Sequence, residues 1–416
     1  MCKYCSEISS FSQLKKAWNH VKRKRDVTPG EDRETVREFE NNLQQNLRAI
    51  SQKVAGGKHI FSRVLQKNIP KKKGSKATRP IRIYTVNDKV TQTSIRITLE
   101  RIRGKSFLFP EIQNEVSVGF LDKNYYKGGS VGVKLSVQKL RQFYKEGYLR
   151  FVIADIKDFF EEVDKKRLEK IILSRLKPCN NLSRLLRKML DPKVVEIDRY
   201  SASEKEMPQT ISGVAQGSVV SPLLSNIYLM EFDKKLEENG IRAIRYADDI
   251  LIAAKTMTQA KKLRENTRKL LEKHAQLSFH GPGSKKEPKI GHIYSGVEYL
   301  GLFIQKTQKG NRWCIRPADS KIAEQKQKLF NTLKPSYDTD LYTRIGFLNR
   351  SIKSWFTTYE YAGCTKGDMK TLYRELKESF NSQVNHLLLS KKIISKQLSK
   401  QQMEFLGVLP PKLVFK

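Results

Sequence analysis

The 416-residue chain has few cysteines, few histidines and few acidic residues, and it has no long apolar run. No stretch approaches the ~20 apolar residues that a membrane span needs, and nothing near the N-terminus resembles a signal peptide. Five cysteines are consistent with a reducing compartment rather than with a disulfide scaffold. The six histidines are scattered, and none is paired in sequence with an acid as in a nuclease or hydrolase site. We therefore expect a cytoplasmic protein with no membrane partner.

The shortage of acids leaves a strong positive charge. Lys and Arg number 80 against 43 Asp and Glu, which gives a formal net charge of +37 and a pI of about 9.9. The excess is spread along the chain. Because each neutralised phosphate releases counterions, a basic chain of this kind is suited to binding nucleic acid. A generally solvated basic surface is the alternative that charge alone leaves open.

Cys2 and Cys5 form a CxxC pair. No second CxxC or HxxxH follows at the spacing of a zinc ribbon, so the pattern favours a frayed terminus over a metal site.

Adjacent carboxylates are the most informative feature. Tyr246-Ala247-Asp248-Asp249 stands between two β-prone runs, 241–245 and 250–254, which predicts a hairpin with two acids at its tip. Such acids repel one another unless a cation lies between them. Asp155 ends another β-like run, 149–154. Three carboxylates at strand ends can hold a pair of Mg²⁺ ions, which stabilise the attacking and leaving oxygens of a phosphoryl transfer. The pattern indicates nucleotide polymerisation.

Other segments predict the surrounding elements. Thr35 and Glu38 form a capping box that begins a helix predicted to run to residue 54. Residues 69–83 predict two short strands around a basic Gly/Ser turn, or simply a solvated loop. Residues 213–218 form a Gly-punctuated loop that opens a helix, with Ser221 as N-cap and Pro222 at the first helical position. Beyond residue 316 the apolar spacing predicts three basic helices.

The motifs in this order resemble those of reverse transcriptases, above all the group II intron lineage. They are Asp155-Ile156-Lys157-Asp158-Phe159-Phe160, Gln216-Gly217 ahead of Ser221-Pro222, the YADD tetrapeptide, and Tyr299-Leu300-Gly301. The similarity extends over about residues 10–380. It implies an α/β (α+β) right-hand polymerase. Residues 1–144 would form an N-terminal extension and fingers. Residues 145–305 would form a palm of antiparallel strands with helices on one face, with a fingers insertion around 165–212. Residues 306–416 would form a helical thumb and a basic tail.

The resemblance also implies roles for individual residues. Two Mg²⁺ ions, or Mn²⁺ as a substitute, would be held by Asp155, Asp248, Asp249 and the backbone carbonyl of Ile156. The incoming dNTP would be contacted by Lys72, Arg79, Asp158, Phe159, Phe160 and Gln216, with Lys71 or Lys73 as a substitute for Lys72. Lys285 or Lys286 would assist the leaving pyrophosphate, and Tyr299, Leu300 and Gly301 would form the primer grip.

Two of these side chains have plain structural alternatives. Phe160 would pack beneath the sugar and leave no room for a 2′-hydroxyl, but it could also be an ordinary core aromatic. Gln216 could be a turn residue bonded to its own backbone.

Departures from the family pattern refine the expectation. Ala215 replaces the usual proline before Gln216, and Ser221-Pro222 stands where enzymes of diversity-generating retroelements carry Ser-Gln. Retron hallmarks and an endonuclease cluster after the thumb are missing. The chain thus looks like a standalone bacterial "unknown group" enzyme that resembles class 2 defence-associated reverse transcriptases.

We therefore expect an RNA-directed DNA polymerase that copies a structured non-coding RNA template from a DNA primer in antiphage defence. A group II intron-derived maturase that binds intron RNA is one alternative. A catalytically inactive RNA-binding protein is another, but the three strand-end acids argue against it. The sequence leaves the oligomeric state, the priming mechanism and the identity of the template open.

Overall fold

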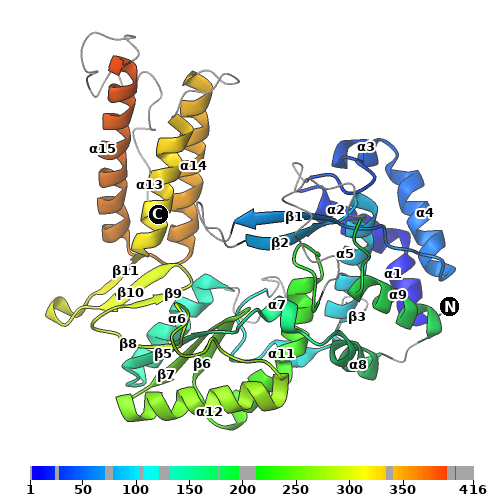
Figure 1. Ribbon diagram of the computed structural model, residues 1–416, viewed down its shortest axis with the longest axis horizontal. Coiled ribbons are helices and arrows are strands. Elements are labelled where there is room, and N and C mark those ends of the chain that lie inside the picture. The colour runs from blue at the N-terminus through cyan, green and yellow to red at the C-terminus, as the bar shows by residue number, and fades with distance from the viewer. Residues whose placement is uncertain are drawn as a thin grey trace. The chain divides into compact units, whose positions relative to one another are not determined.

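The computed structural model describes residues 2–23, 28–70, 78–102, 106–120, 132–176, 179–195, 212–333, 341–390 and 399 (Figure 1). The chain divides into two compact units, each with many contacts between its own Cα atoms. The first comprises Met1–Lys127, Asp155–Ile250 and Glu265–Glu287, and the second comprises Gly128–Ala154, Leu251–Arg264 and Pro288–Lys416. The assignment of fingers, palm and thumb to the residues given above stays a prediction.

The first unit begins with four helices, α1 (Lys3–Ser9), α2 (Phe11–Val21), α3 (Val36–Asn41) and α4 (Leu43–Ala55). The predicted capping box is present, since Thr35 accepts from the backbone N–H of Glu38 and the Glu38 carboxylate accepts from that of Thr35. The prediction of one unbroken helix was wrong. The chain leaves helical geometry at Asn42, with φ −113° and ψ 29°, and the Asn46 side chain donates to the Phe39 carbonyl near the break. The terminus is not frayed at Cys5, because α1 buries that residue.

The predicted strand pair is confirmed. Strands β1 (Leu65–Pro70) and β2 (Thr78–Ile83) pair antiparallel, with Ile69 opposite Arg79. Lys71, Lys72 and Lys73 lie outside the described residues. The chain continues through the largely buried α5 (Val86–Glu100), the short pair β3 (Arg101–Ile102) and β4 (Ser106–Phe107), and the 3-10 helix η1 (Pro110–Ile112).

Four further helices belong to the first unit: α7 (Phe159–Glu162), α8 (Lys165–Arg175), α9 (Asn180–Leu190) and α11 (Ser221–Glu238). Ser221 was wrongly predicted as the N-cap of α11. Val220 precedes the helix, and the Ser221 hydroxyl donates instead to the Ala215 carbonyl at 2.8 Å. The helix therefore begins one residue earlier than predicted, and Pro222 is its second residue rather than its first; its missing N–H still costs nothing there.

A four-stranded sheet has the order β6-β7-β5-β8. Its strands are β5 (Arg150–Asp155), β6 (Ala243–Tyr246), β7 (Asp249–Ala254) and β8 (Lys289–His292). Strand β8 runs antiparallel to β5. Residues 250–254 of β7 are all buried, which explains why this strand reads as a continuous apolar run. Helices α6 (Val133–Lys145) and α12 (Met257–Ala275) precede β5 and follow β7 in the chain.

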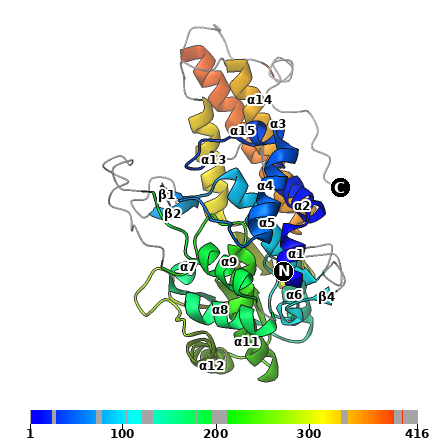
Figure 2. The same ribbon diagram turned by 90° about the vertical axis from the view of Figure 1, so that its right-hand side faces the viewer.

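The second unit contains a three-stranded antiparallel sheet and three long helices. The strands are β9 (Val297–Tyr299), β10 (Leu302–Lys306) and β11 (Trp313–Pro317), with the 3-10 helix η3 (Lys309–Asn311) between the last two. Helices α13 (Asp319–Leu333), α14 (Leu341–Tyr361) and α15 (Lys366–Ser390) lie side by side in both views (Figures 1 and 2). They share a core that includes Leu348, Ile352, Phe356, Leu372 and Leu376, which confirms the three predicted helices. In the described part of the chain, no helix combines the length and apolarity of a membrane span.

Candidate active site

The two adjacent acids lie on a tight hairpin, as predicted. Strand β6 ends at Tyr246 and β7 begins at Asp249, so the turn consists of Ala247 and Asp248 alone. Ala247 has φ 56°. Two-residue hairpin turns require positive φ, which Gly or Asn adopts more readily than Ala. The backbone at the tip is therefore strained, and strain of this kind persists only where the surroundings fix it.

A buried ion pair provides that support. Arg245 donates to both carboxylate oxygens of Asp233, at 2.7 and 2.5 Å, and both side chains are fully buried. The third nitrogen of the same guanidinium, Nη1, donates to the Ala247 carbonyl and to Asn226 Oδ1, each at 3.2 Å. This pair was not predicted from the sequence. Its only signal was an arginine within an otherwise apolar strand.

Asp155 is brought to the hairpin by the sheet. Strands β5 and β7 are neighbours, and just beyond β5 the Ile156 N–H donates to the Asp248 carbonyl at 3.0 Å. The three predicted carboxylates therefore lie at adjoining strand ends. The role of the Ile156 carbonyl as a metal ligand stays a prediction.

The acids disturb one another electrostatically. Burial, followed by the charges of Asp248 and Asp155, raises the pKa of Asp249 to about 7. Burial and the charge of Asp155 also raise the pKa of Asp248. The cations Lys286 and Arg79 oppose both shifts. Carboxylates that resist ionisation in this way attract a compensating cation.

Two basic side chains contact Asp155. Lys286 Nζ lies 2.7 Å from Oδ2, and His280 Nε2 lies 3.1 Å from Oδ1. Of the two lysines considered from the sequence, Lys286 is therefore seen to reach the acids. His280 was missed, because nothing in its local pattern points to residue 155. Despite His280, the buried Oδ1 makes no well-formed hydrogen bond to any described residue.

This donor set fits divalent metal ions. Hard cations such as Mg²⁺ take oxygen ligands and are held by one or two carboxylates plus substrate phosphates. The three carboxylates meet that requirement. The pKa values of Asp248 and Asp249 are raised, and Asp155 has a buried oxygen without a well-formed hydrogen bond among the described residues.

The loop 213–217 packs between β2 and the turn that begins α7. Val214 N–H donates to the Phe160 carbonyl at 2.6 Å, and Arg82 N–H donates to the Gln216 carbonyl at 2.7 Å. Gly213 and Gly217 have φ 61° and 107°, and a Cβ on them would lie 2.0 Å from the Phe160 oxygen and 2.2 Å from the Arg82 oxygen. Only glycine fits at these two points. The loop thus joins three of the segments predicted to bind the nucleotide.

The predicted nucleotide-binding residues differ in exposure. Arg79 is exposed on β2, and Asp158 is exposed ahead of α7 with φ 39°. Phe159 is buried, while Phe160 is half-buried. The Gln216 side chain donates to the Glu161 carboxylate at 3.2 Å, rather than to its own backbone. Their contacts with a nucleotide stay predictions.

Tyr299 is the last residue of β9, and Leu300 and Gly301 form the turn to β10 in the second unit. Leu300 and Gly301 have φ 51° and 75°, and Tyr299 is buried. The Gly301 carbonyl accepts from Ala318 N–H at 2.9 Å, which fixes the turn to the start of α13. The primer-grip role stays a prediction.

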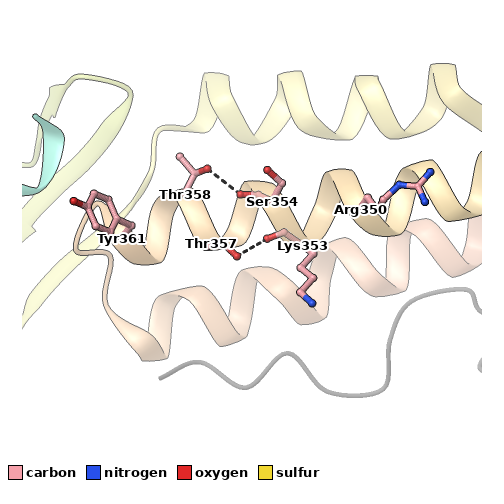
Figure 3. A pocket seen from close by; sticks show the side chains of 6 residues that line it. All are labelled: Arg350, Lys353, Ser354, Thr357, Thr358 and Tyr361. Carbon is pink, nitrogen blue, oxygen red and sulfur yellow. Dashed lines mark hydrogen bonds between the residues drawn. The ribbon is translucent and has the colours of Figure 1, made fainter. Parts of the chain in front are cut away.

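A pocket on α14 offers cations and hydroxyls together (Figure 3). It is lined by Arg350, Lys353, Ser354, Thr357, Thr358 and Tyr361. Thr357 and Thr358 donate to the carbonyls of Lys353 and Ser354, at 2.9 and 2.8 Å, so their hydroxyl oxygens can still accept. Tyr361 is exposed. Cations, hydroxyls and an exposed ring are groups that bind phosphates, sugars and bases.

Comparison with known proteins decides the family. The sequence pattern described as reverse transcriptase (RNA-dependent DNA polymerase) matches residues 69–302, more than half of the chain. The chain belongs to the reverse transcriptase family. The match includes the three carboxylates, the loop 213–217 and strand β2, and it confirms the predicted right-hand polymerase class.

This reverse transcriptase-family chain is similar to a group II intron-encoded protein and to a protein of Escherichia coli. It is 33% identical over 191 residues to the group II intron-encoded protein LtrA of Lactococcus lactis, a stretch that covers 46% of the chain and 28% of LtrA. It is 25% identical over 338 residues to protein YkfC of Escherichia coli, covering 73% of the chain and 82% of YkfC. Thus the chain spans less than a third of the length of LtrA.

Among solved structures, telomerase from Candida albicans in complex with a TWJ fragment of telomeric RNA is similar with a TM-score of 0.43 and 12% identity. That similarity covers 90% of this chain and 68% of the telomerase chain.

Proposed function

We propose that the chain is an RNA-directed DNA polymerase, which extends a DNA primer with dNTPs on an RNA template. The observation that carries the proposal is the meeting of Asp155, Asp248 and Asp249 at adjoining strand ends, with the pKa values of the last two raised. A protein that only bound RNA would gain nothing from three acids placed where each destabilises the others.

In this reaction the primer 3′-hydroxyl gives up its proton to solvent, and its oxygen forms a bond to the α-phosphorus of the dNTP. The bond from that phosphorus to the bridging oxygen breaks, and pyrophosphate leaves. Asp155, Asp248 and Asp249 would hold two Mg²⁺ ions, or Mn²⁺ in their place, which stabilise charge on the attacking and leaving oxygens when bound. Arg79 would bind the triphosphate oxygens in a bidentate manner. Lys286 Nζ, at the edge of the acid cluster, would donate to the departing pyrophosphate.

Selection of the deoxy sugar would fall to Phe160. Its carbonyl is held by Val214 and its ring centroid lies 5.3 Å from that of the buried Phe159, so its position is set by packing. A ring fixed in this way would exclude a 2′-hydroxyl.

The α14 pocket would hold the template–primer duplex by its backbone. A-form helices are recognised mainly through phosphates and 2′-hydroxyls, and Arg350, Lys353 and the two threonines offer the matching donors and acceptors.

The test is primer extension with purified protein. We expect synthesis that requires a divalent metal ion and that Asp248→Asn abolishes. Asp319→Asn is the matched control, because this exposed acid on α13 pairs only with the nearby Arg316 among the described residues. A variant Asp248→Asn with wild-type synthesis would refute the polymerase proposal.

On the resemblance described above, we further propose that the template is a dedicated, structured non-coding RNA and that the cDNA serves antiphage defence. Sequencing the RNA and DNA that co-purify with wild-type protein and Asp248→Ala tests this. One abundant structured RNA in both samples, with complementary cDNA only in the wild type, is expected. A spliced or intron-bearing RNA would instead support a maturase.

A further inference from the structure

Three of the five cysteines lie together in the first unit, and none belongs to a polymerase motif. The sulfur atoms of Cys2, Cys5 and Cys179 all lie within 4.8 Å of one another. Cys179 Sγ is 2.6 Å from Cys2 Sγ and 3.5 Å from Cys5 Sγ. The fold brings these residues together from opposite ends of a long stretch of chain.

Two helix starts position the three sulfurs. Cys2 immediately precedes α1 and Cys5 lies in its first turn, and residues three apart on a helix share one face. Cys179 immediately precedes α9, and the Leu182 N–H donates to its sulfur at 3.4 Å. Cys5 is 1% exposed, whereas Cys2 and Cys179 are partly exposed. The cluster is therefore closed on one side and open on the other.

Neutral thiols do not explain this arrangement, because they are weak donors and weak acceptors. A disulfide would use two of the sulfurs and leave the third without a role. A metal ion would use all three. Around a tetrahedral Zn²⁺ with Zn–S bonds of about 2.3 Å, two sulfurs are about 3.8 Å apart, a separation that the cluster reaches with small side-chain movements.

We propose that Cys2, Cys5 and Cys179 form a Zn²⁺ site, with the fourth position open to water or another external ligand. Soft thiolates select Zn²⁺ over the Mg²⁺ of the active site. The Leu182 N–H would stabilise the Cys179 thiolate, as backbone donors around metal ligands do. The site would tie α1 to α9. The CxxC pair alone gave too little evidence for it, since the third ligand is distant in sequence.

The test is the zinc content of the full-length protein purified under reducing conditions. We expect about one zinc ion per chain in the wild type and in Cys314→Ser, a matched control outside the cluster, and a loss of at least tenfold in Cys5→Ser and Cys179→Ser. Cobalt substitution of the wild type should give thiolate-to-metal charge-transfer absorption that the two cluster variants lack. Asp248→Asn should keep its zinc, which separates this site from the polymerase proposal.

Alkylation of the wild type covers the case in which the serine variants do not fold. Cys2, Cys5 and Cys179 should be protected from alkylation until a chelator is added, while the reactivity of Cys314 should stay unchanged. A metal-free wild-type protein, with or without a Cys2–Cys179 disulfide in peptide maps, would overturn the proposal. So would zinc that a folded Cys179→Ser variant retains in full.

Discussion

Replacing Asp249 with asparagine should stabilise the metal-free protein at alkaline pH while destroying its activity. The native pKa of this carboxyl is about 7, against an ordinary value of 3.8, because of burial and the charges of Asp248 and Asp155. A group with a raised native pKa contributes fully to stability below its unfolded pKa, and the contribution is lost as pH rises to the folded pKa. Above pH 7 the protein carries the whole cost of the ionised form.

The size of the effect follows from the two pKa values. Their difference corresponds to about 4 kcal/mol as an upper limit. Because Asp249 is partly exposed and its neighbours can take up a proton in its place, we expect about 2 kcal/mol. Asparagine has the same shape without the charge. In a chain of this size that gain raises the melting temperature by about 2 °C.

Thermal melts of the wild type and Asp249→Asn, in excess chelator at pH 5 and pH 8, measure this gain in stability. The gain from Asp249→Asn should be present at pH 8 and less than half as large at pH 5, where the native carboxyl keeps its proton. Mg²⁺ added at pH 8 should raise the melting temperature of the wild type more than that of the variant. Asp319→Asn is the control, and it should lower the melting temperature instead of raising it. The hydrogen bond and charge of Arg316 lower the pKa of Asp319, so its ionised form is stabilising. A melting temperature lowered equally at both pH values by Asp249→Asn would refute the electrostatic reasoning.

Four further changes test other parts of the site. Phe160→Ala should raise incorporation of ribonucleotides relative to deoxyribonucleotides by about 10- to 100-fold, measured as a ratio of kcat/KM values; an unchanged ratio would mean that the ring only fills the core. Gly217→Ala should cost about 1–3 kcal/mol through positive φ and raise the KM for dNTP, because its Cβ would meet the Arg82 carbonyl; wild-type melting and KM would contradict this. Asp233→Ala should cost about 3–5 kcal/mol, as removal of one partner of a buried pair does, seen as a lowered melting temperature; the double change Asp233→Leu with Arg245→Met should be milder. The double variant Arg350→Ala with Lys353→Ala should weaken duplex binding. In titrations at several salt concentrations, its salt dependence should fall by the equivalent of about two phosphate contacts. Lys370→Ala, on the exposed surface of α15, should change binding much less.

The sequence predicted the parts of the site whose signals are local. The YADD hairpin could be recognised because apolar runs on both sides fix β6 and β7, and only a short turn lies between them. The strand pair of residues 69–83 and the three long helices were predicted for the same reason, since apolar periodicity is a property of neighbouring residues. The break at Asn42 was not, because the apolar spacing continues across it and gives no local signal of the change in backbone geometry.

Features that depend on tertiary contacts could not be predicted from the sequence. Arg245 and Asp233 form a buried pair from a strand and a helix, His280 reaches Asp155 from a loop far along the chain, and Cys179 meets Cys2 and Cys5. Each pairing joins residues that are unremarkable in their own segments. Only the fold specifies which of them meet.

The buried Arg245–Asp233 ion pair also explains how the predicted acids keep their positions. A turn with positive φ at Ala247 and two partly buried carboxylates would rearrange if the hairpin were free to move, because relaxation would relieve both the strain and the repulsion. The Arg245 guanidinium prevents this, since it holds the Ala247 carbonyl on one side and is itself fixed by Asp233 on the other. Releasing the hairpin would break the hydrogen bond from this buried guanidinium to the Ala247 carbonyl, and a buried polar group left without its partner is destabilising. The acids are therefore held in their unfavourable arrangement until cations compensate them, and that readiness to bind cations is what a metal-dependent polymerase requires of its active site.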